Sequence, residues 1–248
     1  LVPGDKIVFR GSVWAVVEID DEVTVSPSAS LGELPRWIGE DIPVPFSVAQ
    51  EASQRLADGN WAGLPITREA LDVLQSYHES IADAGVMPSP ECLTVEQHER
   101  LFILNYPGGS RLNRTIGMIV TAMLTAKSGY KIGFQFDPYR IILDVPARTT
   151  VKDLLAILKG FVPEVGSLLR FAIKDSPSLK PQLLHSARKM GAIAPDADIG
   201  KFGMKKLMEA YSDTPLYTEA VERFLFHQLD ENGMEKFIHQ INSGEITV

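Results

Sequence analysis

Three basic side chains recur at helical spacing in the second half of the chain. His185, Arg188 and Lys189 stand at i, i+3 and i+4, which places them on one face of a helix. Arginine and lysine that share one helical turn can bind the phosphates of a nucleic acid through their charge. A solvated helix face without any ligand is the alternative that the same spacing allows.

An arginine beside a tryptophan is the second candidate for chemistry. Arg36 and Trp37 lie in a segment that begins with Pro35 and ends at Pro45. Proline on both sides keeps this segment out of a central strand or helix, so we expect a stiff loop. A tryptophan on such a loop can stack on a nucleobase. The alternative is a tryptophan packed into the core of the preceding strands.

A glycine pair precedes the strongest helical pattern of the chain. Gly108 and Gly109 come just before an apolar stripe that predicts a helix over 111–127. A helix start of this kind can present backbone N–H groups to a phosphate, although a plain turn is the commoner explanation of two glycines before a helix. Arg111 and Arg114 fall mostly outside the apolar stripe.

Motifs of the common enzyme classes are missing. The sequence has no G-x-x-x-x-G-K-[ST] loop, no H-E-x-x-H pair and no G-x-S-x-G elbow. The single cysteine, Cys92, excludes an internal disulfide and a cysteine-rich zinc cluster, and we expect a buried or idle thiol. The histidines are expected on exposed helix faces rather than in a metal site. No active site therefore emerges from the residues, although missing motifs alone do not exclude an enzyme.

Charge is distributed unevenly along the 248 residues. The net charge is −8, yet residues 1–104 hold 6 basic and 17 acidic groups (net −11). Two later segments are basic: 105–140 with 5 basic and 1 acidic groups, and 159–206 with 9 and 4. The acidic average argues against nucleic acid as a partner, whereas the two basic segments are where a polyanion would bind.

The hydrophobic periodicity predicts an α+β fold. Strand patterns fill 5–27, 92–105 and 132–145, and helix patterns fill 46–56, 67–84, 111–127 and most of the chain after 149. We expect a small antiparallel β-barrel or sheet joined to a mostly helical platform. The predicted divisions are 1–48 for the first strands, 49–148 for mixed elements that complete the sheet, and 149–248 for a helical domain. No segment is apolar enough over about eighteen residues to cross a membrane.

Several segments, in this order, carry a resemblance to a known family. They are RGSVWAVVEID at 10–20, PRWIGE at 35–40, VPFSVAQE at 44–51, GSRLNRTIG at 109–117, DPYRI at 137–141, ARKMGAI at 187–193, YSDTPLYTEA at 211–220 and GEI at 244–246. In these segments the chain resembles the large helicase-related (Lhr) family of ATP-dependent superfamily 2 helicases, in the region that follows the motor and winged-helix domains. The chain departs from the family in two places. It has Tyr106 and Pro107 where members often have His and Phe before the glycine, and it has Leu183 and Leu184 where they often have an aromatic residue before the basic helix.

The resemblance implies a nucleic-acid-binding accessory domain of an ATP-dependent DNA or RNA helicase. Such a domain holds the translocated single strand, while ATP and magnesium bind in the motor domains and no cofactor binds here. The implied contacts are phosphate contacts by Arg111, Arg114, Arg188 and Lys189, base stacking by Trp37 beside Arg36, and a hydrogen bond from Asn113. The implied partners are single-stranded nucleic acid and the motor and winged-helix domains of the same polypeptide, without a membrane. A cytoplasmic location and a role in DNA repair follow only from the family.

A second function competes with this one. The acidic first third, residues 1–104, fits a protein-interaction module that docks a basic partner. Because the sequence starts at Leu1, with no signal-peptide pattern in its first ten residues, we expect a piece of a longer protein. Whether this piece has an enzymatic activity of its own stays open, since the ATPase motifs are absent.

Overall fold

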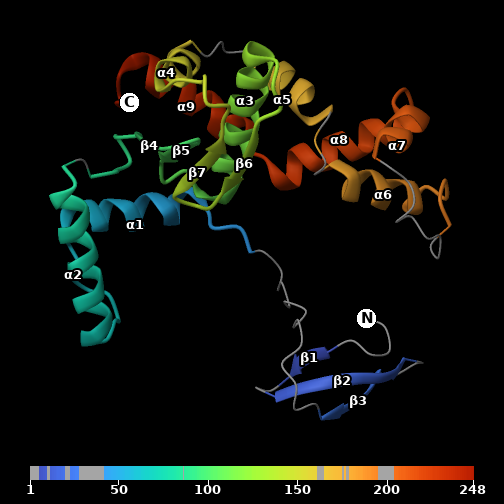
Figure 1. Ribbon diagram of the computed structural model, residues 1–248, viewed down its shortest axis with the longest axis horizontal. Coiled ribbons are helices and arrows are strands. Elements are labelled where there is room, and N and C mark those ends of the chain that lie inside the picture. Colours follow the sequence, from blue (N-terminus) through green and yellow to red (C-terminus); the bar gives the residue numbers. More distant parts are fainter. Residues whose placement is uncertain are drawn as a thin grey trace. The chain divides into compact units, whose positions relative to one another are not determined.

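The computed structural model describes residues 6–9, 12–19, 23–27, 42–85, 87–160, 165–174, 176, 179–194 and 204–248. The chain forms two compact units, Leu1–Ile42 and Pro43–Val248 (Figure 1). Each unit has its own sheet. The predicted domain divisions near 48 and 148 stay predictions.

The first unit contains a three-stranded antiparallel sheet in the order β1-β2-β3. Its strands are β1 (Lys6–Phe9), β2 (Ser12–Ile19) and β3 (Val23–Pro27). A register shift between Val16 and Glu18 interrupts the regular pairing of β2 with β3, and Val16 is buried while Val17 is exposed. This is the open-sheet form of the predicted strand region, because among the described strands the sheet does not close into a barrel.

The second unit holds the remaining elements, which alternate between helices and strands before becoming helical. They are α1 (Phe46–Asp58), α2 (Arg68–Asp83), β4 (Thr94–His98), β5 (Leu101–Asn105), α3 (Gly109–Ser128), β6 (Gly133–Phe136), β7 (Arg140–Asp144), α4 (Val151–Lys159), α5 (Val165–Lys174), α6 (Lys180–Lys189), α7 (Met204–Tyr211), α8 (Pro215–Gln228) and α9 (Glu231–Ser243). The α+β class predicted from the sequence is confirmed.

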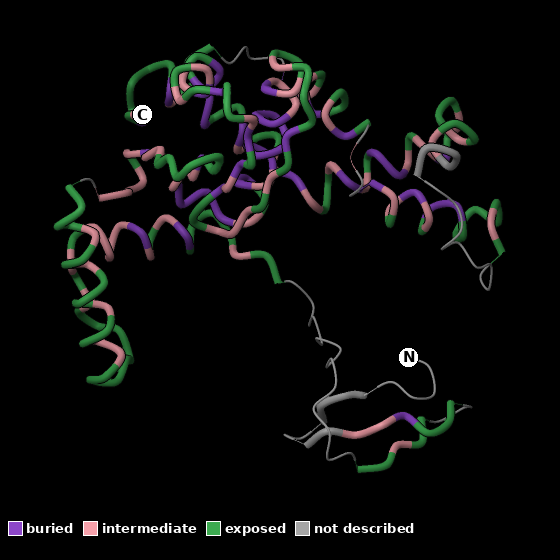
Figure 2. The backbone as a smooth tube through the Cα atoms, in the orientation of Figure 1, coloured by how far each residue is buried: buried purple, intermediate pink, exposed green. Residues whose placement is uncertain are grey.

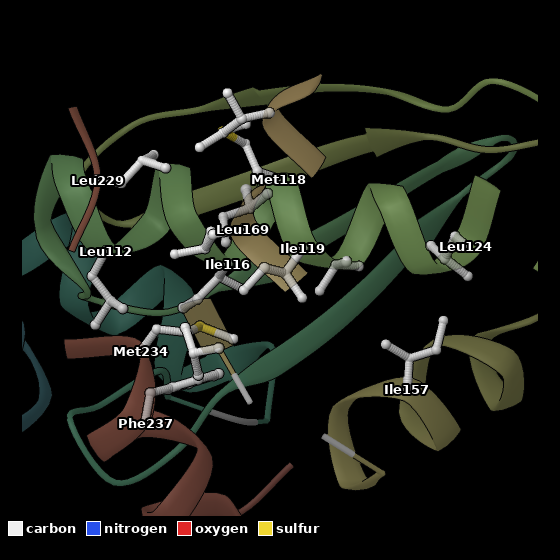
Figure 3. Packing of buried hydrophobic residues seen from close by; sticks show 14 of the residues in the cluster. Leu112, Ile116, Met118, Ile119, Leu124, Ile157, Leu169, Leu229, Met234 and Phe237 are labelled. Carbon is white, nitrogen blue, oxygen red and sulfur yellow. The ribbon is translucent and has the colours of Figure 1, made fainter. Parts of the chain in front are cut away.

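The central helix α3 organises this unit. Its buried residues are not confined to one face of the helix, because eleven of its twenty residues are buried. In Figure 3, Leu112, Ile116 and Ile119 point toward Met234 and Phe237 of α9. Figure 2 shows the buried positions concentrated around this helix. Burial on several sides is what a hydrophobic helix inside a domain requires, so α3 connects the sheet to the helices.

The second sheet covers one side of α3. Its four antiparallel strands run in the order β4-β5-β7-β6, and β6 and β7 pack on α3. Alternate residues of the two central strands, Phe102 and Leu104 on β5 and Ile141 and Leu143 on β7, are fully buried. This alternation is the pattern of a sheet with one face on the core.

Helices α4, α5 and α9 pack on the other sides of α3, whereas α6 packs on α8 and lies farther from the sheet (Figure 1). Lys127 near the end of α3 donates to Asp153 of α4 at 2.7 Å. That hydrogen bond, together with those from Thr150, holds the pKa of the Asp153 carboxyl well below its usual range. The N-terminus of α4 is thereby fastened to the central helix.

The predicted first helix begins at Phe46, with Pro45 at its N-cap and no side-chain cap. One local prediction was wrong. His98 ends strand β4 rather than lying on a helix, because the hairpin turn at 99–100 follows it. Histidines 185, 227 and 239 do lie on exposed helix faces, as expected.

Candidate nucleic-acid interface

The glycine pair before α3 forms a tight junction rather than an open phosphate cradle. The amide of Gly109 donates to the Pro138 carbonyl at 2.9 Å, and the amide of Ser110 donates to the Val44 carbonyl at 3.0 Å. A Cβ on Gly109 would lie 2.8 Å from the Val44 oxygen, and its φ of +71° also favours glycine. These first N–H groups are therefore used by the chain itself.

Arg111 fastens α3 to the end of α8. Its Nε donates to the carbonyl of Leu229 at 2.9 Å, and its Nη2 donates to the carbonyls of Phe226 and Leu229, the former at 2.6 Å. Carbonyls at a helix C-terminus lack intrahelical partners and carry partial negative charge. The guanidinium of Arg111 supplies both the hydrogen-bond donors and the positive charge that these carbonyls lack. The geometry therefore gives Arg111 a structural role.

Arg114 lies one helical turn later and also faces α8. Its guanidinium stands over the rings of Phe224 and Phe136, 5.0 and 5.7 Å from their centroids. Its Nη1 donates to the side-chain oxygen of Gln228. Arginine over two aromatic faces is a cation–π arrangement, and it keeps this side chain half-buried between α3, α8 and β6.

Asn113 is fully buried beneath the start of α3. Its amide nitrogen donates to the carbonyl of Tyr106 at 2.9 Å and to that of Asp137 at 3.0 Å. The side chain thus joins the loop before α3 to the β6–β7 turn. Its Oδ1 has no hydrogen-bond partner among the described residues, and Gly108 leaves the space that this oxygen needs.

The stripe on α6 has a different environment. His185, Arg188 and Lys189 are exposed, and together with Pro181 and Leu184 they line a shallow hollow of about 610 Å³. The opposite face of α6, formed by Leu183, Ser186 and Ala187, is buried. The structure records no ion pair of Arg188 or Lys189 with any residue that it describes. The predicted common face for the three basic residues is confirmed, and these charges face outward.

The predicted nucleic-acid contacts do not all gather in one place. Arg111 and Arg114 lie where α3 meets α8, while Arg188 and Lys189 line a hollow formed by α6 residues alone. Arg36 and Trp37 lie outside the described residues. Binding of nucleic acid by each of the seven residues stays a prediction.

A groove between α1 and α2 is a feature that the sequence did not reveal as a site. Leu71, Leu74, Tyr77 and Ile81 of α2 have the spacing of a core face, yet α2 has no buried residue. Leu74, Tyr77 and Ile81 instead line an apolar groove opposite α1. The periodic pattern indicated that this face needs cover, but the pattern could not indicate that the chain leaves it open.

Within the described part of the chain, no group of three or more histidine, cysteine, aspartate or glutamate side chains could hold a metal ion. None of the described helices combines the length and the apolar character that a membrane-spanning helix needs.

The chain is similar to known proteins in family and in fold. A family model described as DEAD/H associated matches residues 87–248. Among solved structures, the fold is similar to that of the Mycobacterium smegmatis helicase Lhr bound to ssDNA and AMP-PNP, with a TM-score of 0.64 and 18% identity. The similarity covers 88% of this chain and 31% of that one, so the chain spans about a third of the helicase. The search of curated proteins finds no match.

Proposed function

Because the chain belongs to the DEAD/H-associated family, we propose that it is an accessory domain of an ATP-dependent helicase and holds a single nucleic-acid strand. The similar fold of a helicase bound to ssDNA supports this assignment. The observation that carries it is the exposed stripe of His185, Arg188 and Lys189 on α6. In this proposal, ATP and magnesium bind to the motor domains of the same polypeptide. The protein acts in the cytoplasm, in DNA repair.

The stripe is suited to a nucleic-acid backbone because its charges are available. Arg188 and Lys189 occupy the last turn of a helix whose buried face holds it against α8. An arginine fork and a lysine ammonium, adjacent on one turn, would each neutralise a phosphate and release its counterions. Contacts of this kind fix the strand without reading its sequence. The half-buried Leu184 in the same hollow offers an apolar contact for a sugar or base.

Trp37, beside Arg36, would stack on one base of the strand. An aromatic platform is worth about 1–3 kcal/mol per base and tolerates any sequence. Arg111, Asn113 and Arg114 would then act on the strand indirectly, since they hold α3, α8 and the β6–β7 turn together.

Fluorescence anisotropy of a labelled single-stranded oligonucleotide tests the proposal at several salt concentrations. The informative variant is R188A/K189A, and the matched control is K152A/K236A, which removes two exposed lysines from α4 and α9. Each lost phosphate contact lowers the salt slope of log K by about 0.7 for single strands. We therefore expect the first variant to lose about 1.4 from the slope and the control to lose little.

Equal losses in the two double variants would mean that only net charge matters and would contradict a site on α6. W37A tests the stacking part separately, because removing a neutral ring lowers the affinity and leaves the salt slope unchanged. An unaltered chain that fails to bind at low salt would refute strand holding by this domain.

The second function, docking of a basic partner by the acidic first third, gains a specific observation from the structure. Part of that third, α1 and α2, forms the two helical walls of the apolar groove.

A further inference from the structure

The groove between α1 and α2 is an apolar feature of the second unit that strand binding does not explain. It has a volume of about 750 Å³, and its lining is predominantly apolar. Helix α1 contributes one wall, helix α2 and the turn between them the second, and the β6–β7 turn the end. Among the lining residues are Val48, Leu56, Trp61, Leu74, Tyr77 and Tyr139.

Fixed contacts hold the walls of the groove in place. Gln50 of α1 donates to the carbonyl of Pro107 at 2.8 Å, which anchors this helix on the loop before α3. The His78 ring of α2 donates through Nδ1 to the carbonyl of Leu56 at 2.7 Å, which ties α2 to the end of α1. The groove is therefore preformed, and an occupant would pay little to open it.

The apolar side chains in the groove are left open to solvent. The exposed fractions are 52% for Val48, 55% for Tyr77 and 43% for Tyr139. Helix α2 is sixteen residues long and has no buried residue. Helices of this length are marginal in water, and in proteins they are stabilised mainly by packing of an amphipathic face. A contiguous apolar surface framed by polar residues marks an interaction site.

Charge decides which kind of partner fits. The two arginines at the groove are already paired with carboxylates: Arg55 with Glu51 at 2.7 Å and Arg140 with Asp137 at 2.5 Å. Residues 42–85, which form both helical walls, carry 6 carboxylates and 2 arginines, a net charge of −4. This field repels the phosphates of a nucleic acid and attracts a cation within a Debye length of about 8 Å.

We propose that the groove docks a basic amphipathic helix of a protein partner. Two helical walls leave a furrow that a third helix fills with apolar side chains at i, i+3 or i+4, and i+7. Lysines and arginines on the flanks of that helix would lie near Glu51 and in the acidic field of α1 and α2. The docked helix would give α2 the packing that the chain itself does not supply. This inference goes beyond strand holding and gives the acidic first third a definite docking surface.

Binding of a synthetic peptide to the whole 248-residue chain tests the proposal. The probe is a fluorescein-labelled helix of about 18 residues, five turns, with leucines on one face and lysines elsewhere. A scrambled peptide of the same composition keeps the charge and loses the apolar face. We expect saturable binding of the first peptide and at least tenfold weaker binding of the second, since every 1.4 kcal/mol changes the dissociation constant about tenfold.

A matched pair of variants locates the binding site. V48R places a charged, bulky side chain in the groove, whereas V17R makes the same change at a valine of nearly equal exposure, 53%, in the first unit. V48R should weaken the amphipathic peptide about tenfold or more and V17R less than about twofold. Circular dichroism of both variants shows that the fold is kept, as expected for two half-exposed positions.

Three outcomes would overturn the proposal. Equal binding of the scrambled peptide would show attraction by charge alone. If a single-stranded oligonucleotide competes with the peptide, and V48R abolishes this competition, the groove is a nucleic-acid site. A dimer of the unaltered chain that V48R converts to a monomer would make the occupant a second copy. R188A/K189A should bind the peptide like the unaltered chain, so failure of peptide docking and failure of strand holding are distinguishable.

Discussion

Two pairs of basic residues look alike in the sequence and have different surroundings in the structure. Arg111 and Arg114 on α3 contact carbonyls, an amide and aromatic rings of neighbouring elements. Arg188 and Lys189 on α6 face outward from a shallow hollow. Charge spacing alone thus does not separate a residue that holds the fold from one that is available to a ligand. The difference comes from what packs opposite each helix.

The first prediction breaks the α3 pair. R111A/R114A should lower the free energy of unfolding by about 3–4 kcal/mol, because it removes charge-assisted hydrogen bonds to the end of α8 and the cation–π contacts with Phe224 and Phe136. Urea denaturation followed by circular dichroism measures the loss. Any fall in strand affinity should then disappear once the measurement is made under conditions where the variant is fully folded. A stable variant with weakened binding would instead make these arginines direct phosphate contacts.

The second prediction sharpens the picture of the anchored region through pH. Tyr106, which precedes α3, is 1% exposed and packs against Phe237 with ring centroids 4.9 Å apart. Burial, assisted by the negative charge of Glu91, raises the pKa of Tyr106 from 10.0 to about 12. The unfolded chain ionises first, so the stabilisation is complete below pH 10 and is lost as the pH rises toward 12. The loss amounts to about 1.4 kcal/mol for each pH unit in that window.

The Y106F variant provides the comparison for this titration. Phenylalanine keeps the ring and cannot ionise, so the difference between the two unfolding free energies should change across pH 10 to 12 while background titrations cancel. Unfolding by urea at pH 8, 10 and 11 is sufficient. A constant difference across this range would show that the Tyr106 hydroxyl reaches solvent in the folded state.

The positions of individual helices were predictable from the sequence. Which basic residues hold the fold together and which remain available to a ligand was not predictable. The stripe of apolar residues over 111–127 predicted α3, and Gly129 ends the helix in the left-handed conformation that favours glycine. The helix pattern over 67–84 predicted α2, and the side chain of Thr67 caps the start of this helix by accepting a hydrogen bond from the Ala70 amide. These features depend on neighbours within a few residues.

The roles of the remaining residues depend on contacts with residues that are distant in the sequence. Arg111 contacts residues more than a hundred positions away, at the end of α8. No local sequence pattern predicts such a contact. The apolar face of α2 was recognisable, but whether a face is covered depends on tertiary structure alone. The α6 stripe was the part of the candidate site predicted best, because i, i+3, i+4 spacing places side chains on one face whatever else the chain does.

The smallest expected effect on stability comes from the α6 pair, and it completes the contrast. R188A/K189A should change the free energy of unfolding by less than about 0.5 kcal/mol, since surface substitutions without a buried partner rarely do more. Thermal unfolding of R188A/K189A and R111A/R114A, followed by differential scanning fluorimetry under the same conditions, measures the change in stability. If the exposed pair proves as important to the fold as the α3 pair, a contact of Arg188 or Lys189 must exist beyond the described residues, and the stripe is structural. If stability is unchanged while the salt slope of strand binding falls, the stripe contributes to function without contributing to the fold, which is the signature of a binding surface.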